Sequence, residues 1–584
     1  TLRSVWNGCV QTASFTTPAN RTFSVPSGSS AGNGKRPSFW TLIGNIFYKE
    51  AAAAAIWTMR TINAFRNFIT GFAGQLVSML LSFASRTVFI YVLGEEYLGV
   101  NGLFSSILSV LSFSELGIGA AITYELYKPI ADKDSEKIRS LMLFYKKAYF
   151  FIGSFILLAG LVLLPFLPYL MKETTGLVNV RVIYVLFLVN NAASYWFFSY
   201  KQNLLYCMQK NYVNALVTAG TSIAAMALQI VLLLALRKDP VTAFYAYTVS
   251  GLLLGIASNY ALKYQADKMY PELRETGAAP LDRETKKHIF KNVTGLTVSN
   301  LCGIALTSAD NILISAFISV GTVGVYGNYL TLKKYISRLM DTLFGSIAAG
   351  IGDVCAGDDT EKKEHLFHVL QFTYFWLYGF TAICFWNLYN VFIAGVWLHD
   401  TKWLLPDVTV ALIVVNYLLD GLNGAVYKYR VACGLHWEVK YRHLFSAIFN
   451  VFISYALMGP CGLGVTGVLL GTTASILIMI SFDPYLIYKK VFKKSSIPYY
   501  LSYIGYLALI AATCALVSLL CAPFSEYNVL HCLIRLAICL IVPNGVWFIL
   551  FRKSPSFLFL WDKMYKLLGS VKRKVSDGRK DNEQ

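Results

Sequence analysis

The sequence carries little charge for its length. Only 14% of its 584 residues are Asp, Glu, Lys or Arg, whereas 56% are hydrophobic. Soluble domains contain roughly 25% charged residues, so this composition excludes a soluble globular protein and indicates an integral membrane protein. The eleven cysteines include no CxxC pair and lie mostly inside apolar runs. Their distribution argues against a disulfide framework and against a zinc site, and we expect no metal and no cofactor.

The apolar residues gather in runs that are long enough to cross a bilayer, which takes about 20 residues of α-helix. Fourteen such runs predict an all-α polytopic membrane protein with about 14 transmembrane helices. Their approximate ranges are 67–93, 97–122, 143–170, 179–203, 213–236, 241–263, 293–318, 321–349, 367–396, 404–428, 442–459, 462–482, 499–521 and 529–551.

Lysine and arginine are concentrated in alternate connections between these runs. Basic connections such as "YKPIADKDSEKIRS" and "YKKVFKKSS" alternate with short, weakly charged ones such as "GEEYLG" and "LHDTK". Because basic connections stay on the cytoplasmic side, both termini are expected in the cytoplasm, in a multi-pass protein of the bacterial plasma membrane. The net charge of +19 at pH 7 is then a signal of topology, and we expect no nucleic-acid partner.

Composition divides the chain into six segments. Residues 1–58 are rich in Ser, Thr, Gly, Pro and Asn, which indicates a disordered or non-native extension ahead of Met59. The expected order after it is an N-lobe of six helices at 59–263, a cytoplasmic linker at 264–291, a C-lobe of six helices at 292–482, two further helices at 483–551, and a basic amphipathic tail at 552–584.

The tail pattern is typical of a helix that lies on a membrane surface. One helical stripe carries apolar residues and lysines and arginines surround it, as in helices that bind anionic lipids. A disordered basic tail is the alternative. The stripe consists of Phe557, Trp561, Met564, Leu568 and Val571.

A weak internal repeat relates the two expected lobes. Gly99-Val100-Asn101-Gly102, after the first helix, aligns with Gly324-Val325-Tyr326-Gly327, after the seventh. Six helices separate the copies, so both would enter the membrane in the same orientation. Parallel repeats of this kind are related by an axis along the membrane normal, and the substrate site lies between the halves.

The run at 321–349 contains four charged residues, namely Lys333, Lys334, Arg338 and Asp341. Lys334, Arg338 and Asp341 share one helical face, with Lys333 beside it. A charge at the bilayer centre costs about 2.5–3.5 kcal/mol on insertion scales, so this stripe should face the interior of the bundle or a wet cavity. Two interpretations remain open. Either Asp341, together with Glu115, neutralises the bases, or the surplus of positive charge binds an anion such as a diphosphate.

Four further ionisable residues fall within apolar runs. Arg86 is close to the external end of the first helix, where it either lines the cavity or reaches the interface. Glu115 is toward the cytoplasmic end of the second helix and could pair with a base. Asp310, near the external end of the seventh helix, is a candidate gate or ion site. Asp420 is near the cytoplasmic end of the tenth.

Two segments resemble a known family. Residues 59–122, "MRTINAFRNFITGFAGQLVSMLLSFASRTVFIYVLGEEYLGVNGLFSSILSVLSFSELGIGAAI", resemble the N-terminal signature of bacterial polysaccharide flippases, and "LTSADNILISAFISVGTVGVYGNY" resembles the start of their second lobe. These flippases of O-antigen or capsule repeat units belong to the multidrug/oligosaccharidyl-lipid/polysaccharide (MOP) exporter superfamily. The resemblance covers 59–551 and implies two pseudo-symmetric six-helix lobes in a V plus two C-terminal helices.

The resemblance also implies a function. A lipid diphosphate-linked oligosaccharide would cross the membrane by alternating access, for surface polysaccharide biosynthesis. Cationic cavity residues of the superfamily bind the diphosphate, a role that falls by chemistry on Lys333, Lys334 and Arg338 and by position on Arg86. Anionic lipids and other polysaccharide-assembly proteins are the further expected partners, and H⁺ or Na⁺ is a candidate coupling ion.

Two other functions remain open. The first is a cation-coupled multidrug exporter of the same superfamily, which should offer acidic residues to organic cations. The second is a membrane polysaccharide polymerase or glycosyltransferase, which would need catalytic groups in external connections that are only a few residues long here. We therefore expect a transporter rather than an enzyme.

Overall fold

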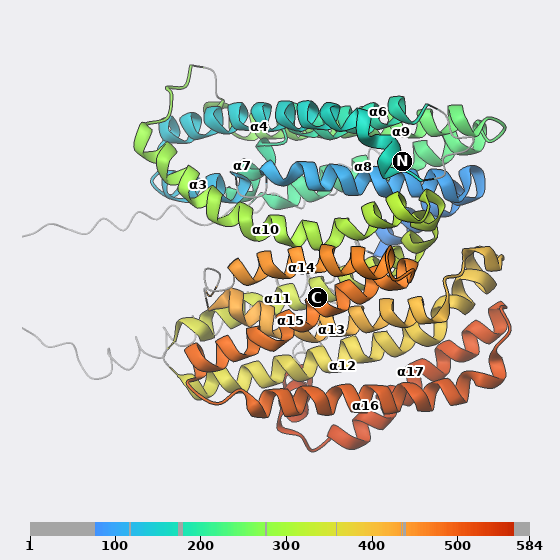
Figure 1. Ribbon diagram of the computed structural model, residues 1–584. Coiled ribbons are helices and arrows are strands. Elements are labelled where there is room, and N and C mark those ends of the chain that lie inside the picture. Colours follow the sequence, from blue (N-terminus) through green and yellow to red (C-terminus); the bar gives the residue numbers. More distant parts are fainter. Residues whose placement is uncertain are drawn as a thin grey trace, which may run out of the picture. The chain divides into compact units, whose positions relative to one another are not determined.

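The computed structural model describes residues 76–115, 118–172, 179–208, 210–274, 277–357, 359–433, 435 and 440–565. In these ranges all regular structure is helical (Figure 1), which confirms the all-α prediction. The expected extension at 1–58 and the part of the tail after Tyr565 lie outside the described residues.

The longer helices follow one another along the chain with short connections. After a first helix at Leu76–Leu111, they are α3 (Ile118–Ala131), α4 (Ser135–Leu163), α6 (Val180–Trp196), α8 (Asn211–Ala235), α9 (Pro240–Met269), α10 (Arg283–Phe317), α11 (Val320–Ala356), α12 (Thr360–Phe392), α13 (Asp407–Ala432), α14 (Lys440–Met458), α15 (Gly464–Ile487), α16 (Ile497–Cys521) and α17 (Val529–Phe551). Short helical pieces join or extend them: η1 (Ser112–Glu115), η2 (Leu164–Phe166), α5 (Leu167–Leu170), α7 (Lys201–Cys207), η3 (Pro271–Leu273), η4 (Ile393–Trp397), η5 (Thr401–Trp403), η7 (Tyr488–Phe492) and η8 (Ala522–Phe524).

Nine helices in the described part of the chain are long and apolar enough to cross a membrane. A tenth span is obtained if α6 and α7, which meet at a 45° bend, count as one. The predicted number of fourteen is therefore not confirmed. The helices α10, α11 and α14 occupy three of the predicted ranges but are not among the apolar nine. The two predicted spans at 67–93 and 97–122 meet in the single helix Leu76–Leu111.

Gly94 divides that first helix into two segments. Its φ of +84° is left-handed, a conformation that glycine adopts without steric cost and that ends a right-handed helix. Residues 76–93 and 95–111 therefore need not share one axis, and each segment packs against the start of α11 on its own side of Gly94, as described below.

Polar residues start several of the helices. The side chains of Asp134, Asp239, Ser319 and Asp359 accept hydrogen bonds from backbone amides in the first turns of α4, α9, α11 and α12, which satisfies groups that have no partner within the helix. Asp282 does the same for α10 and also pairs with Lys137 Nζ at 2.8 Å. The bonds from Lys137 and Thr285 hold the pKa of Asp282 well below its usual range.

Consecutive helices pack side by side within two groups. In the N-terminal group α4 contacts α6, and α8 contacts α9; in the C-terminal group α12 contacts α13, α14 contacts α15, and α16 contacts α17. Figure 1 shows the same neighbours running alongside one another. The helix α10 joins the groups, since it contacts α3 and α5 as well as α11, α14 and α15.

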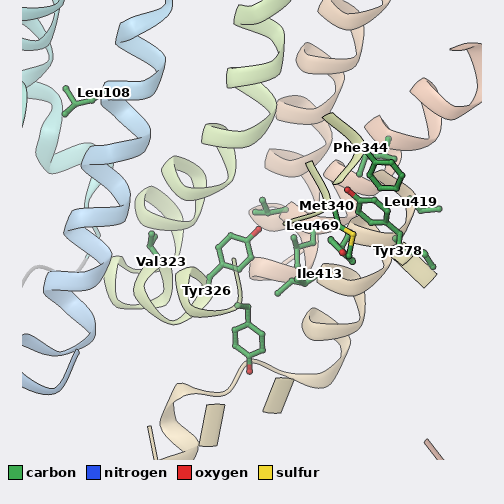
Figure 2. Packing of buried hydrophobic residues seen from close by; sticks show 14 of the residues in the cluster. Leu108, Val323, Tyr326, Met340, Phe344, Tyr378, Ile413, Leu419 and Leu469 are labelled. Atoms are coloured by element: carbon green, nitrogen blue, oxygen red, sulfur yellow. The ribbon is translucent and has the colours of Figure 1, made fainter. Parts of the chain in front are cut away.

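Aromatic residues fill much of the core of the C-terminal group. Phe344 of α11 stacks on Tyr374 of α12 with ring centroids 3.7 Å apart. Figure 2 shows Phe344 and Met340 of α11 beside Tyr378 and Leu419, so that α11, α12 and α13 share one packed layer. This layer fixes the rotation of α11 and hence the direction of its charged residues.

The described start of the tail is helical at 555–565. Phe557 packs on Trp376 of α12 and on Phe548 of α17, with centroid distances of 5.8 and 5.7 Å. Trp561 and Met564 of the predicted apolar stripe remain exposed. The apolar stripe is therefore packed against the protein at Phe557 and exposed at Trp561 and Met564.

Candidate functional site

The four charged residues of α11 lie on a helix that begins at Val320. Lys334 and Arg338 follow that start by 14 and 18 residues, or about 21 and 27 Å along the axis. Lys334, Arg338 and Asp341 are exposed, whereas Lys333 is half-buried. Exposed charges at this depth would be unstable against lipid, so this face of α11 requires a polar environment.

Lys334 and Arg338 form a cationic pair without a close acidic partner. Among the described residues neither makes an ion pair within 4 Å, and the charge that acts on Lys334 is that of Arg338, which repels it. Two neighbouring cations that repel each other favour a bound anion, because an anion offsets the repulsion and accepts charge-assisted hydrogen bonds.

Lys333 belongs to a different environment from its neighbour. It acts electrostatically on Asp310 of α10 and on Asp420 of α13. Asp310 is buried and accepts hydrogen bonds from Tyr326 and, at 3.4 Å, from Thr472 Oγ1. Asp420 is exposed and repelled by Asp341. Two of the four candidate carboxylates, Asp310 and Asp420, therefore interact with Lys333.

Arg86 of the first helix is hydrogen-bonded to the C-terminal helix group. Its Nε and Nη2 both donate to Asn328 Oδ1 of α11, at 3.2 and 2.9 Å. Asn328 is fully buried. The arginine therefore lies between the two groups in this conformation, as a cavity role requires, but it holds a neutral amide and has no carboxylate within 4 Å among the described residues.

Glu115 lies apart from these bases. It ends η1 and accepts a hydrogen bond from Tyr149 at 3.0 Å and another from Tyr195 at 3.4 Å. Neither partner is charged, and within the described ranges Glu115 forms no ion pair within 4 Å. Lys333 is thus within electrostatic reach of Asp310 and Asp420, whereas Glu115 lies elsewhere and hydrogen-bonds to tyrosines.

The two repeat segments contact each other reciprocally. A Cβ added to Gly99 would overlap the carbonyl oxygen of Val320, and one added to Gly324 would overlap that of Glu95. Val320 follows Glu95 by 225 residues, as Gly324 follows Gly99. Such an exchange of equivalent contacts is what a two-fold relation between the segments produces, so the repeat seen in the sequence has a structural counterpart.

Further hydrogen bonds join the first helix to the C-terminal group near this crossing. Trp397 Nε1 donates to Thr87 Oγ1 at 2.8 Å, Tyr91 donates to the carbonyl oxygen of Trp397 at 3.0 Å, and Tyr335 donates to Ser82 Oγ at 2.9 Å. We call these bonds, the Arg86–Asn328 contact and the glycine crossing the Gly94 junction. The junction thus links the first helix to α11 and to η4 of the C-terminal group.

A polar cavity in the N-terminal group has no counterpart among the predicted sites. It lies between the first helix, α6, α8 and α9, and its lining includes Asn101, Asn190, Gln229 and Tyr247. These residues are uncharged and spread over four helices, so no motif marks them. The one signal in the sequence was Asn101, which falls inside the repeat.

Two solved structures share this fold. An inward-facing multidrug resistance transporter of the MATE family of the MOP superfamily aligns with a TM-score of 0.55 and 14% identity, over 71% of this chain and 98% of its own. The lipid II flippase MurJ in an inward closed conformation aligns with a TM-score of 0.55 and 16% identity, over 82% and 98% of the two chains. The chain therefore has the fold of MOP superfamily transporters, as the resemblance predicted. No family model matches the chain, and no curated protein matches it in sequence.

Proposed function

We propose that this multi-pass membrane protein is a flippase that moves a lipid diphosphate-linked oligosaccharide across the bacterial cytoplasmic membrane, for surface polysaccharide biosynthesis. The observation that carries the proposal is the exposed pair of Lys334 and Arg338, which repel each other deep along α11. A diphosphate supplies the negative charge and several acceptor oxygens, and arginine can bind it bidentately. The transporter fold supports movement rather than chemical conversion of this ligand.

The lipid part of the substrate would stay in the bilayer while the head passes through the protein. The Gly94 junction supports alternating access, since the hydrogen bonds and the glycine crossing that link the two groups there can separate without unfolding either group. The Trp561 and Met564 side chains, exposed on a tail that carries Lys563, support attachment of the tail to anionic lipid. Proton or Na⁺ coupling and contact with polysaccharide-assembly proteins complete the proposal.

Transport can be measured directly in proteoliposomes. The probe is a fluorescent polyprenyl diphosphate-linked disaccharide, and dithionite quenching reports the fraction that has crossed. We expect Lys334→Gln combined with Arg338→Gln to abolish transport. The matched control is Arg237→Gln combined with Lys238→Gln, which removes the same two charges from exposed positions between α8 and α9. Full activity in the first double variant, or equal loss in the second, would contradict the proposal.

Cation-coupled multidrug export is the second candidate, because the MATE transporter matches the fold as well as the flippase does. An organic cation would bind the exposed carboxylates of Asp341 and Asp420 rather than the Lys334–Arg338 pair. The same liposomes loaded with ethidium test this. Loss of ethidium transport in Asp341→Asn combined with Asp420→Asn, with disaccharide transport absent in the unmodified chain, would favour the exporter.

A further inference from the structure

The polar cavity of the N-terminal helix group consists of two adjoining parts. One has a volume of about 440 Å³ and the other about 330 Å³, and both are lined by Asn190, Ser194 and Gly251. These volumes lie within the range of about 300–1,000 Å³ that is typical of small-molecule sites. Neither lining contains an Asp, Glu, Lys or Arg residue. A ligand recognised here must therefore be uncharged in the part that the cavity holds.

The lining has hydrogen-bonding groups that the fold does not use. The side-chain amides of Asn101 and Asn190 bond to no other residue of the described chain, and Gln229 donates one N–H to the carbonyl oxygen of Tyr247 at 3.3 Å, leaving its own oxygen available. A primary amide offers two donors and one acceptor oxygen. Such groups are costly against hydrocarbon, so this wall faces water or a polar ligand.

An aromatic surface borders the same amides. The rings of Phe187 and Tyr247 line the larger part of the cavity, and Tyr247 is held edge-on against Phe89 with centroids 5.0 Å apart. A small number of convergent polar groups beside aromatic rings is the arrangement that orients a small polar ligand in a cleft. Sugars match this pattern, because their hydroxyls both donate and accept hydrogen bonds while their C–H faces are apolar.

The cavity and the cationic pair also lie at similar distances from the starts of their own helices. Gly251 and Asn259, which line the smaller part, are 11 and 19 residues from the start of α9 at Pro240, or about 16 and 28 Å along the axis. Lys334 and Arg338 lie about 21 and 27 Å from the start of α11. Tyr247 in addition packs on Phe89, which follows Arg86 by three residues on the first helix, so the cavity borders the segment that contains Arg86.

We propose that this polar cavity binds the neutral sugars of the transported head group, while the Lys334–Arg338 pair binds its diphosphate. The assignment rests on the proposed flippase function and names a second contact region for its substrate. An unpaired charge on the sugar would meet no counter-charge in the lining, so the cavity selects uncharged sugars. An apolar ligand would leave the Asn101 and Asn190 amides buried without partners, at a cost.

Binding to the purified full chain in nanodiscs tests the proposal. Four probes are compared by titration: farnesyl diphosphate, farnesyl diphosphate carrying a hexose, the same carrier with an N-acetylhexosamine disaccharide, and a farnesyl disaccharide without phosphate. We expect at least one glycosylated diphosphate to bind about tenfold more tightly than farnesyl diphosphate, the gain of about 1.4 kcal/mol that one or two neutral hydrogen bonds give.

Variants assign that gain to the cavity. Asn101→Leu combined with Asn190→Leu should lower the tenfold preference to about one without changing the affinity for farnesyl diphosphate, and Asn190→Gln, which keeps the amide, should retain most of it. The control is Asn544→Leu on α17, which loses a hydrogen bond from Trp376 but lies outside the cavity. Gel filtration shows that each variant remains folded.

The outcomes separate this inference from the proposed function. Equal affinity of the unmodified chain for all three diphosphates, or a preference that survives in the Asn101 and Asn190 double variant, overturns the sugar site. If farnesyl diphosphate fails to bind while the phosphate-free disaccharide binds in an Asn190-dependent manner, the sugar site stands and the diphosphate part of the proposed function fails.

Discussion

Replacing Asn328 with leucine should loosen the Gly94 junction. The Asn328 side chain is completely buried, and its Oδ1 is the acceptor for both Nε and Nη2 of Arg86. Leucine has a similar size but offers no acceptor. In the closed conformation the guanidinium group then lacks its partner, whereas in an open conformation it is hydrated, so the change weakens the closed state selectively.

The size of the effect follows from these contacts. A hydrogen bond to a charged group contributes about 1.5–3 kcal/mol to stability. Because about 1.4 kcal/mol corresponds to a factor of ten, the substitution should raise the population of the open junction about 10- to 150-fold. Other bonds at the junction, such as Tyr335 to Ser82, remain, so the closed state should still predominate if its present margin is a few kcal/mol.

Hydrogen exchange measured by mass spectrometry on the full chain in nanodiscs reports this opening. We expect faster exchange, by the same factor, in peptides that cover 82–99 and 320–330. The matched control is Asn416→Leu, which removes a buried amide whose bonds run to Leu469 and Thr473 within the C-terminal group. Unchanged exchange at the junction in Asn328→Leu, or an equal rise there in Asn416→Leu, would refute the reasoning.

Three further changes have expected outcomes. Asp483→Asn should lower the thermal unfolding temperature in detergent far more than Asp400→Asn, which changes an exposed helix cap. Asp483 is the buried counter-charge of Arg430 and Arg442, and loss of such a partner costs about 3–5 kcal/mol. Equal shifts of the unfolding temperature would contradict this. Gly324→Ala should speed amide hydrogen exchange at the Gly94 junction, because the added Cβ overlaps Glu95. Gly220→Ala, which has open space around the added atom, should not. Similar exchange rates at the junction in both variants would contradict the close contact of Gly324 with Glu95. Hydrogen bonds from Lys137 and Thr285 lower the pKa of Asp282 in the folded protein. The ionised Asp282 therefore stabilises the start of α10 fully above its unfolded pKa of about 4. This stabilisation is lost as the pH falls through the lower pKa of the folded state. Amide protection at 283–286 should therefore be reduced by Asp282→Ala at pH 7, and protection that does not change would contradict this role.

The sequence predicted the parts of this fold that depend on local pattern. Apolar runs locate the helices, the charge stripe places Lys333 to Asp341 on one helix, and the offset of 225 residues pairs Gly99 with Gly324. These features follow from composition and periodicity, which act over short stretches of chain. The number of spans is not confirmed, because α10, α11 and α14 are not among the nine helices of the described residues that are long and apolar enough to cross a membrane.

The partners of the site residues could not be predicted in the same way. Arg86 meets Asn328 across 242 positions of sequence, and Glu115 meets Tyr149 and Tyr195 rather than a base. Each pairing depends on which helices become neighbours and how each is rotated. The polar cavity is harder still, since Asn101, Asn190 and Gln229 are individually unremarkable and gain significance only when four helices bring them together.

The fold alone does not choose between a flippase and a multidrug exporter, because the MATE transporter and the MurJ flippase named above align with equal TM-scores. The positions of the charged residues around α11 support the proposed flippase over the exporter. Adjacent residues on a helix point about 100° apart. Lys333 is within electrostatic reach of Asp310 and Asp420, whereas the charge that acts on Lys334 is that of Arg338. Asp310 and Asp420 thus already interact with a lysine, whereas within the described ranges neither Lys334 nor Arg338 makes an ion pair within 4 Å. An anionic substrate would bind the Lys334–Arg338 pair without disturbing the interaction of Lys333 with Asp310 and Asp420. A cationic substrate would have to compete with Lys333 for those carboxylates.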